Sequence, residues 1–348
     1  MKIAFILPSL VNKGPIIVVH NIVKNLKKSV DLIDVYYFDE SNSSLNFECD
    51  IYQISKTQFI DFDKYDIIHS HTLRSDLYVY KWKNKIKKAK ILTTIHQDTF
   101  ASFSIRYNRF ISSIITLYWC YVQRQFDGVV AISNQLKNKY NKLLSGKITT
   151  IYNGCDITEA KTQIEIENLI RQYKNHKYKV LGAYATITQG KGLLQIVKVL
   201  DLLPDYVFVL IGEGPYLETI KSYVEKFKLS NQVLFIPYIE APYSYLSLMD
   251  VYMMPSYSEG FGLAMVEAAL AKKSIVCSNI PSFNEIFNSD EVCFFELDNL
   301  NSLRNSIKTA YLERLQRGER ANSKVTMFFT AEKMAENHLL YYKKLLKK

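Results

Sequence analysis

Cysteine is scarce in this chain: there are five cysteines among 348 residues, and none stands in a CxxC pair. An odd, scattered set is typical of a reducing compartment and excludes a disulfide framework and a zinc knuckle. Disorder is excluded as the main state, because 48% of the residues are hydrophobic and 13% are aromatic. A chain of this length can therefore build a large core, as two domains or one large one.

Long hydrophobic runs are missing as well. The first apolar run, at residues 3–7, is too short for the core of a secretory signal and is predicted to be a strand. The longest other stretch, 110–122, has about 13 residues and is interrupted by Ser112, Ser113 and Thr116, whereas a spanning helix needs about 20. We therefore expect a cytoplasmic protein that does not cross the membrane and lies, at most, on its cytoplasmic face.

Acidic residues are nearly absent from one window of the sequence. Residues 81–147 hold thirteen lysines and arginines but only Asp98 and Asp127, a charge of +11, while the whole chain carries +10. The rest of the chain is thus close to neutral. This distribution predicts one basic surface that faces an anionic partner.

The chain does contain a regular alternation of short apolar segments and helical patterns. A strand at 2–8 is followed by a turn with Gly14 and Pro15 and by a helical pattern over 16–26, which is the opening unit of a doubly wound sheet. Such alternation implies parallel sheets with right-handed crossovers. Further strands are predicted at 33–38, 67–70, 90–95, 128–133, 180–185, 207–211, 233–236, 251–254 and 275–278.

The pattern changes near residue 156, and a second alternating series follows it. We predict an α/β protein of two tandem domains with a cleft between them. The first covers 1–156, the second covers 157–329, and a last segment, 330–348, forms a helix that packs back toward the first domain. Helices of the later part are predicted at 158–177, 193–203, 216–227, 264–271, 303–317 and 331–346.

The most informative segment runs from Pro255 to Glu267. It leaves a predicted strand and enters a helix near Gly262, at the carboxyl edge of a parallel sheet, where such folds bind ligands. Gly260 and Gly262 let a ligand approach the backbone, and the helix start favours a negative group. Glu259 and Glu267 suit the hydroxyls of a ribose or a hexose, because carboxylates only accept hydrogen bonds. The alternative is a turn glutamate and an exposed helix glutamate without function.

This segment reads Pro-Ser-x-x-Glu-Gly-Phe-Gly-x-x-x-x-Glu-Ala, which resembles the signature of glycosyltransferase family 4, of the type that builds bacterial polysaccharides and glycans. Other motifs match that family in order along nearly the whole chain, and the conjunction is far more specific than any one motif. The other matches are Gly14, DIIHSH at 66–71, TTIHQD at 93–98, VAIS at 130–133, IYNGCD at 151–156, Lys191-Gly192, GEGP at 212–215 and the segment 250–255.

The resemblance implies the GT-B fold, in which two Rossmann-like domains face each other across a cleft. It also implies a retaining, metal-independent enzyme without a cofactor. Such an enzyme transfers a hexose or N-acetylhexosamine from a nucleotide-diphosphate sugar, here expected to be a UDP-sugar, to an acceptor hydroxyl. Together with the basic window, it suggests a lipid-linked saccharide of surface-polysaccharide biosynthesis as the acceptor.

The resemblance also assigns roles to single residues. Lys191 contacts the donor diphosphate, Glu259 holds the sugar hydroxyls and Glu267 holds the ribose. Gly14 approaches the phosphates and His96 reaches the sugar. The alternatives are a solvated loop lysine for Lys191 and a strand-end histidine satisfied by its neighbours for His96. The backbone N–H groups expected near the donor are those of Gly260, Phe261 and Gly262.

Two positions depart from the family pattern. The family usually has an arginine five residues before the lysine, where this chain has Thr186. A diphosphate clamp of two cations would thus be reduced to Lys191 alone. Pro237 stands where a glycine is common after the strand.

Two further patterns invite a metal-binding interpretation. Asp61-Phe62-Asp63 has the DxD form of metal-dependent glycosyltransferases of the other fold, but it precedes a strand at a polar boundary. His69 and His71 share one face of a strand and have the chemistry of zinc ligands. No further ligand has supporting spacing, so packing is the preferred interpretation and no metal site is predicted.

The basic window mixes its cations with aromatic residues, and we place the acceptor side or a membrane contact there. The residues assigned to it are Trp82, Arg106 and Arg109. A basic face with apolar neighbours suits an anionic lipid surface. The alternative is a solvated lysine face over a buried aromatic helix. Nucleic-acid binding ranks third, because no nucleic-acid motif accompanies the charge.

Two rival functions stay open at this point. One is another reaction on the same fold, such as sugar-nucleotide epimerisation or phosphorolysis. The other is a degenerate, non-catalytic module that binds a nucleotide sugar or a glycan, which Thr186 keeps in play.

Overall fold

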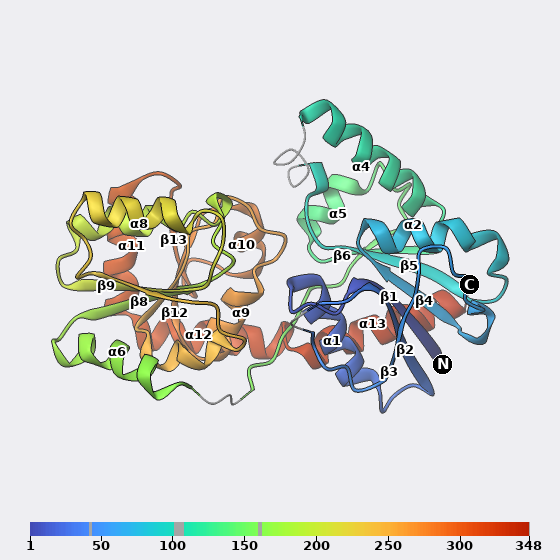
Figure 1. Ribbon diagram of the computed structural model, residues 1–348, viewed down its shortest axis with the longest axis horizontal. Coiled ribbons are helices and arrows are strands. Elements are labelled where there is room, and N and C mark those ends of the chain that lie inside the picture. Colours follow the sequence, from blue (N-terminus) through green and yellow to red (C-terminus); the bar gives the residue numbers. More distant parts are fainter. Residues whose placement is uncertain (42–43, 101–107, 159–161, 348) are drawn as a thin grey trace. The chain divides into compact units, whose positions relative to one another are not determined.

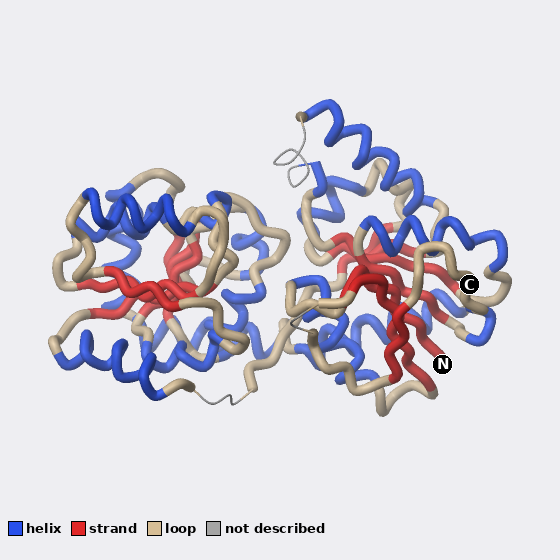
Figure 2. The backbone as a smooth tube through the Cα atoms, in the orientation of Figure 1, coloured by secondary structure: helices blue, strands red, loops and turns tan. Residues whose placement is uncertain are grey.

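The computed structural model describes residues 1–41, 44–100, 108–158 and 162–347. The chain divides into two compact units (Figure 1). Unit 1 comprises Met1–Cys155 together with Phe329–Lys348, and unit 2 comprises Asp156–Phe328. Each unit is a parallel sheet with helices on both faces (Figure 2), which confirms the predicted α/β class.

Unit 1 contains a seven-stranded sheet with the order β3-β2-β1-β4-β5-β6-β7. All neighbouring strands are parallel. The central strand β1 is apolar without interruption from Ile3 to Leu7, and these residues are fully buried because helices cover both faces. The strands are β1 (Lys2–Ser9), β2 (Leu32–Asp39), β3 (Asp50–Gln53), β4 (Ile67–His71), β5 (Lys90–Ile95), β6 (Gly128–Ala131) and β7 (Ile148–Thr150).

Helices α2, α4 and α5 cover one face of this sheet, and α1 and α13 cover the other (Figure 1). The last helix packs on α1, and the Tyr342 hydroxyl is hydrogen-bonded to His69 of β4. The C-terminal segment is therefore an integral layer of unit 1. The helices are α1 (Gly14–Leu26), α2 (Leu73–Trp82), α4 (Arg109–Arg124), α5 (Asn134–Tyr140) and α13 (Ala331–Leu346).

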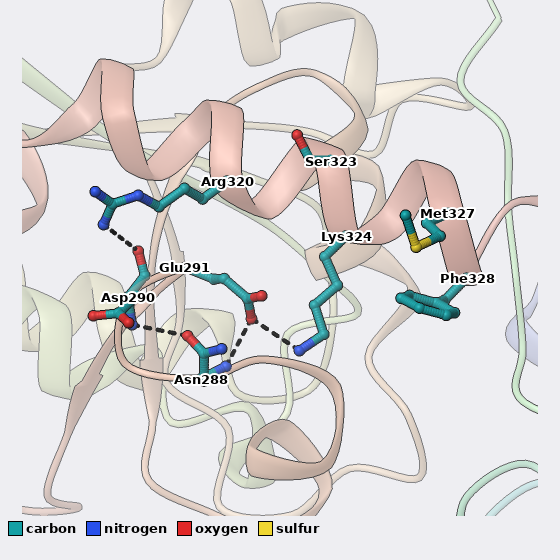
Figure 3. A pocket seen from close by; sticks show the side chains of 8 residues that line it. All are labelled: Asn288, Asp290, Glu291, Arg320, Ser323, Lys324, Met327 and Phe328. Atoms are coloured by element: carbon teal, nitrogen blue, oxygen red, sulfur yellow. Dashed lines mark hydrogen bonds and ion pairs between the residues drawn. The ribbon is translucent and has the colours of Figure 1, made fainter.

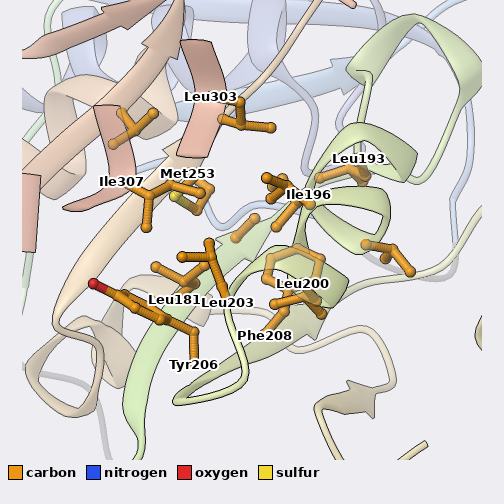
Figure 4. Packing of buried hydrophobic residues seen from close by; sticks show 14 of the residues in the cluster. Leu181, Leu193, Ile196, Leu200, Leu203, Tyr206, Phe208, Met253, Leu303 and Ile307 are labelled. Atoms are coloured by element: carbon orange, nitrogen blue, oxygen red, sulfur yellow. The ribbon is translucent and has the colours of Figure 1, made fainter. Parts of the chain in front are cut away.

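Unit 2 contains a six-stranded parallel sheet with the order β10-β9-β8-β11-β12-β13. Leu181, Phe208 and Met253 of the sheet pack with Ile196 and Ile307 of two helices in one buried cluster (Figure 4). The strands are β8 (Lys179–Tyr184), β9 (Tyr206–Ile211), β10 (Val233–Ile236), β11 (Val251–Met254), β12 (Ser274–Ser278) and β13 (Cys293–Phe295). The helices are α6 (Ile164–Asn175), α7 (Leu194–Val199), α8 (Leu217–Lys226), α9 (Leu263–Leu270), α10 (Pro281–Ile286), α11 (Leu300–Leu312) and α12 (Arg314–Phe328).

One predicted helix is wrong in its extent. The pattern over 303–317 predicted a single helix, but α11 ends at Leu312 and α12 begins at Arg314. Leu312 and Leu315 stay exposed on either side of this break. Helix α12 instead packs on α9. A Cβ on Gly318 would lie 2.1 Å from the Lys272 carbonyl oxygen, so the absence of a side chain there allows the close approach.

No helix among the described residues is long and apolar enough to cross a bilayer. Arg106, one of the three residues assigned to the acceptor side, lies outside the described residues.

Candidate functional site

The segment after β11 brings two predicted site residues together. The Lys191 ammonium lies 2.6 Å from Oε1 of Glu259, and the Ser256 hydroxyl donates a 2.8 Å hydrogen bond to the same oxygen. The Ser256 carbonyl in turn accepts from the Ser278 hydroxyl at the end of β12. Ser256 is buried, whereas Lys191 and Glu259 are partly exposed. The site thus holds a cation and a carboxylate that solvent can still reach. The buried Ser256 holds the carboxylate in place.

The Lys191 loop is locked against the Glu259 loop. Gly192 ends the short helical turn Gln189–Lys191 with a left-handed φ of 65°, and a Cβ on it would lie 2.0 Å from the Pro255 carbonyl oxygen. The Gln195 amide donates to that same carbonyl at 3.2 Å, and the Tyr257 N–H donates to the Gly190 carbonyl at 2.9 Å. The fold therefore requires glycine at 192, because a side chain there would push the two loops apart.

Glu267 lies on α9, next to β8. The Tyr184 hydroxyl donates a 2.6 Å hydrogen bond to its Oε2, and the Tyr184 ring lies 5.1 Å from the Tyr252 ring. Burial raises the pKa of the Glu267 carboxyl, and the Tyr184 hydrogen bond partly offsets this rise. One carboxylate oxygen of Glu267 is thus held in place by the Tyr184 hydroxyl.

The start of α9 shows why the glycines and the phenylalanine stand where they do. Gly262 caps the helix with a φ of 96°, a conformation that favours glycine, and its carbonyl accepts from the N–H groups of Met265 and Val266. The Phe261 side chain is 3% exposed, so a ligand at this turn meets its backbone. Gly260 is partly exposed beside Glu259.

Thr186 lies on the loop that follows β8, and its side chain is exposed. This loop is fixed by the facing Gly212–Gly214 loop, because the Ile187 N–H donates to the Glu213 carbonyl at 2.8 Å. A Cβ on Gly214 would lie 2.3 Å from the Ile187 carbonyl oxygen. The position that holds an arginine in the family is therefore well ordered here but carries no charge.

Gly14 and His96 belong to unit 1. Gly14 is the exposed first residue of α1, and a Cβ added to it would meet no described atom within 4 Å. Within the described part of the fold, no neighbour therefore requires glycine at this position, and the close approach of a ligand is the reason predicted for it. His96 follows β5, and its Nε2 lies 2.8 Å from Nδ1 of His71.

The side chains of the two patterns that invited a metal-binding interpretation form hydrogen bonds within the protein. Asp61 accepts from the Asp63 N–H, and Asp63 accepts from the N–H groups of Lys87 and Lys88, so both carboxylates organise turns. Both ring nitrogens of His69 are hydrogen-bonded, to Tyr342 and Thr94 at 2.8 Å each. Within the described ranges, no three His, Cys, Asp or Glu side chains are grouped to hold a metal ion.

The region predicted to face an acceptor or a membrane lies on α2 and α4. Trp82 ends α2, where its ring packs against Phe59 and lies about 5 Å from the ammonium groups of Lys81 and Lys85. Arg109 begins α4. The outward face of α4 is apolar, with Phe110 75% exposed. The other exposed members of this face are Ile111, Ile114, Leu117, Tyr118 and Tyr121.

The inward face of α4 is unusually polar. Trp119 and Gln123 donate hydrogen bonds to Oδ2 of the fully buried Asp76, at 2.6 and 3.1 Å. Ser70 and Thr93 donate to its Oδ1, at 2.6 and 2.7 Å. Helix α4 thus places hydrogen-bonding groups inside and apolar groups outside, the reverse of an ordinary surface helix.

A further hollow of about 480 Å³ lies between the 288–291 turn and α12 (Figure 3). Lys324 is paired with Glu291 at 3.1 Å, and Arg320 donates to the Asp290 carbonyl at 3.3 Å. Both cations of this hollow thus have partners within it, one a carboxylate and the other a backbone carbonyl. None of the predicted site residues lines it.

Sequence reasoning missed several residues that order the site. Ser256 orients Glu259, Tyr184 orients Glu267, and Gln195 ties the two loops together. The sequence did contain a signal for Ser256, since this residue lies inside the matched signature. Tyr184 and Gln195 had none, because their partners are distant in sequence and only the folded sheet brings them together.

Two parallel-sheet α/β units, one with a lysine–glutamate pair beyond its strand ends, define the class of GT-B proteins. The fold is shared with HepE of Anabaena, solved with UDP and glucose (TM-score 0.83, 16% identity, 99% of each chain covered). It is also shared with sucrose-phosphate synthase of Thermosynechococcus elongatus (TM-score 0.82, 16% identity, 99% of each chain covered). These likenesses confirm the predicted GT-B fold.

The sequence comparisons identify the family. Residues 42–159 match the model for Glycosyltransferase Family 4, and residues 165–324 match that for Glycosyl transferases group 1. The chain is 32% identical over 355 aligned residues to the O-antigen biosynthesis glycosyltransferase WclY of Escherichia coli, covering 100% of this chain and 99% of WclY. The chain belongs to glycosyltransferase family 4, and it is a glycosyltransferase, as its motifs predicted.

Proposed function

We propose that this enzyme transfers a sugar from a UDP-sugar to a hydroxyl of a lipid-linked saccharide during O-antigen biosynthesis, with retention of configuration and without a metal ion. The observation that carries the proposal is the Lys191–Glu259 pair at the glycine turn that begins α9. The similarity to WclY over its full length supports the pathway. The fold shared with HepE, which was solved with UDP and glucose, supports a UDP-sugar as the donor.

In this proposal Lys191 neutralises the charge that develops on the leaving diphosphate. A cation held in place before the reaction stabilises that charge without reorganisation. Glu259 is its present partner, and an arriving diphosphate would take over the ammonium and free the carboxylate for sugar hydroxyls. Glu267 would hold the ribose, and His96 the sugar. Because Thr186 supplies no second cation, Lys191 alone carries this electrostatic task among the predicted contacts.

The donor site is tested by thermal shift and calorimetry with UDP, GDP, ADP and CMP and their common sugars. We expect UDP and one UDP-sugar to raise the melting temperature of the wild type. Lys191→Ala should abolish this rise. Lys221→Ala is the matched control, because this lysine pairs with Glu218 on the exposed surface of the same unit. No stabilisation by any nucleotide, or equal binding by Lys191→Ala, would contradict the proposal.

The exposed charge-free Thr186 favours one second candidate, a module that binds a nucleotide sugar without transferring it. A turnover measurement distinguishes the transferase from the non-catalytic module. Release of UDP that depends on an added lipid-linked saccharide supports the transferase. Tight donor binding without turnover across a broad set of saccharide acceptors supports the module.

The acceptor side is proposed to lie on the apolar face of α4 and the lysines at and after the end of α2. Ile114 and Leu117 are 51% and 48% exposed, and Lys81 and Lys85 lie near the end of α2, which packs against α4. An apolar face beside basic groups suits the interface of an anionic membrane, where a lipid-linked acceptor resides.

Vesicle sedimentation tests this surface. At low salt, the wild type should bind vesicles with anionic lipid more strongly than neutral ones. Ile114→Glu with Leu117→Glu should weaken that binding at least fivefold. Leu312→Glu with Leu315→Glu is the control, since these leucines are 79% and 77% exposed in unit 2. Equal binding to neutral and anionic vesicles would overturn the membrane assignment.

A further inference from the structure

Four of the six histidines of the chain gather inside unit 1. His69 and His71 end β4, His96 follows β5, and His338 lies on α13. The His69 and His71 rings lie 4.2 Å apart, those of His71 and His96 lie 5.1 Å apart, and those of His69 and His338 lie 5.7 Å apart. His69 and His71 are fully buried and His338 is 1% exposed. The role proposed for His96 explains none of the other three.

The two hydrogen-bonded rings, His71 and His96, are neutral. Burial is the main cause that lowers the pKa of each ring, to about 3 for His96 and well below the usual range for His71. The neighbouring His69 and His338 lower the pKa of His71 further. In a pair of neutral imidazoles, one nitrogen must donate and the other must accept. The 2.8 Å contact between Nδ1 of His71 and Nε2 of His96 therefore contains a single proton.

The second nitrogen of His71 decides where that proton lies. Nε2 of His71 is buried and has no hydrogen-bond partner among the residues that the structure describes. A proton on it would be a buried N–H without an acceptor, and orphaned N–H groups are rarer in proteins than under-satisfied acceptors. The proton of His71 therefore lies on Nδ1, which donates to Nε2 of His96. His96 must then carry its own proton on Nδ1.

We propose that His71 is a positioning residue that fixes His96 as its Nδ1–H tautomer, so that His96 presents a hydrogen-bond donor to an oxygen atom of the bound sugar. The identity of the ligand rests on the function proposed above, whereas the tautomer does not. A hydroxyl or an acetamido carbonyl accepts from this N–H, but a free ammonium has no acceptor atom. At the sugar position that His96 contacts, this tautomer thus favours an oxygen acceptor over a free ammonium.

The surroundings hold the His71 ring in place. It packs against His69, whose two nitrogens are fixed by Thr94 of β5 and by Tyr342 of α13. The Phe5 ring of β1 lies 5.5 Å from His69 and 6.0 Å from His71. The rings are thus packed among side chains of three strands and the last helix, so His71 has little freedom to rotate away from His96.

The tautomer is measured directly by long-range ¹H–¹⁵N NMR of protein labelled with ¹⁵N-histidine, at pH 7 and without ligand. We expect His96 to show the pattern of a proton on Nδ1 in the wild type. His71→Phe keeps the ring volume but removes the donor, so His96 should lose this preference. Tyr342→Phe is the control, since it removes a buried hydroxyl from His69 and leaves the His71–His96 contact intact. A proton on Nε2 of His96 in the wild type, or an unchanged pattern in folded His71→Phe, would overturn the proposal.

Ligand binding gives a second readout, which would not change selectively if His71 had only a structural role. His71→Phe should weaken binding of the UDP-sugar, probed with UDP-glucose and UDP-N-acetylglucosamine, by about tenfold, while UDP alone binds as before. His71→Asn places an amide nitrogen near the position of Nδ1 and should restore binding to within about threefold of the wild type. Equal losses for UDP and the UDP-sugar, or no rescue by a folded His71→Asn, would count against the hydrogen bond as the cause.

The two experiments separate the two proposals. The NMR measurement needs no ligand, so it decides the tautomer even if no nucleotide binds. A wild type that binds neither UDP nor a UDP-sugar would contradict the proposed function instead.

Discussion

Glu259 is the residue that links the other polar groups of the site to the proposed donor sugar. It accepts from Ser256 and pairs with Lys191 in the ligand-free protein, and on the proposed mechanism it passes to the sugar hydroxyls when the donor binds. An ion pair between partly exposed groups is weak enough to be exchanged for a ligand. The pair therefore keeps both groups in place without blocking the site.

Replacing Glu259 should reduce turnover rather than stability. Glu259→Ala is expected to lower turnover at least about tenfold, which corresponds to about 1.4 kcal/mol of transition-state stabilisation. The reason is that the hydroxyls of the donor sugar lose the carboxylate that accepts their hydrogen bonds. The measurement is kcat with saturating donor, and Glu218→Ala on the exposed surface is the control. Unchanged turnover in the Glu259 variant would remove this residue from the site.

Two glycines distinguish a requirement of the ligand from a requirement of the fold. A Cβ at Gly14 meets no neighbour among the described residues, whereas one at Gly192 would lie 2.0 Å from a carbonyl oxygen. Gly14→Ala should leave the melting temperature within about 2 °C of the wild type and weaken nucleotide binding. Gly192→Ala should lower the melting temperature clearly, because the Lys191 loop must move. A stable Gly192→Ala, or a Gly14→Ala with wild-type affinity, would contradict this distinction.

At the scale of elements, α4 is held from inside by a buried carboxylate. Asp76 receives four hydrogen bonds, two of them from α4, yet burial raises its pKa from 3.8 to about 6. At a pH between these two pKa values, the carboxyl group is protonated to a greater extent in the folded protein than in the unfolded chain. The free energy of unfolding should therefore fall as the pH rises from about 4 to about 6.

Asp76→Asn isolates this effect. Its amide oxygen can accept from Trp119, which can only donate, and from the NH₂ group of Gln123. Its own NH₂ group then faces Ser70 and Thr93, whose hydroxyls can turn to accept. The stability of the wild type relative to Asp76→Asn should fall by up to about 3 kcal/mol between pH 4 and pH 7. Urea unfolding at several pH values measures this. A difference that does not change with pH would contradict it, and Asp76→Ala should be less stable than both, because it leaves four donors unpaired.

The sequence predicts the elements whose pattern reflects burial and misses those whose pattern does not. β1 and β9 are continuous apolar runs and are correctly predicted. β3 lies at the edge of its sheet with exposed side chains, so no apolar pattern marks it. β7 and β13 have three residues each and are too short to be recognised as strands. Likewise, the Glu259 signature is local in sequence, whereas the His71–His96 contact forms only when β4 and β5 pair.

At the scale of the whole molecule, each unit has its own sheet and its own buried core. We therefore expect two calorimetric transitions. UDP should raise the one that belongs to unit 2, since Lys191, Glu259 and Glu267 all lie there. Tyr342→Ala should lower the other, because it removes a fully buried ring from unit 1. A single transition that both changes move together would show that the units unfold as one.

The return of the last twenty residues to unit 1 also has a consequence for biosynthesis. Unit 2 is continuous from Asp156 to Phe328, so all of it has been translated before α13. Until α13 has been translated, unit 1 lacks the helix that packs on α1 and the hydroxyl that binds His69. Domains tend to fold as units while synthesis proceeds. In this chain the half that is translated first is thus the half that is finished last, and a chain truncated after residue 328 would contain all of unit 2 but only part of unit 1.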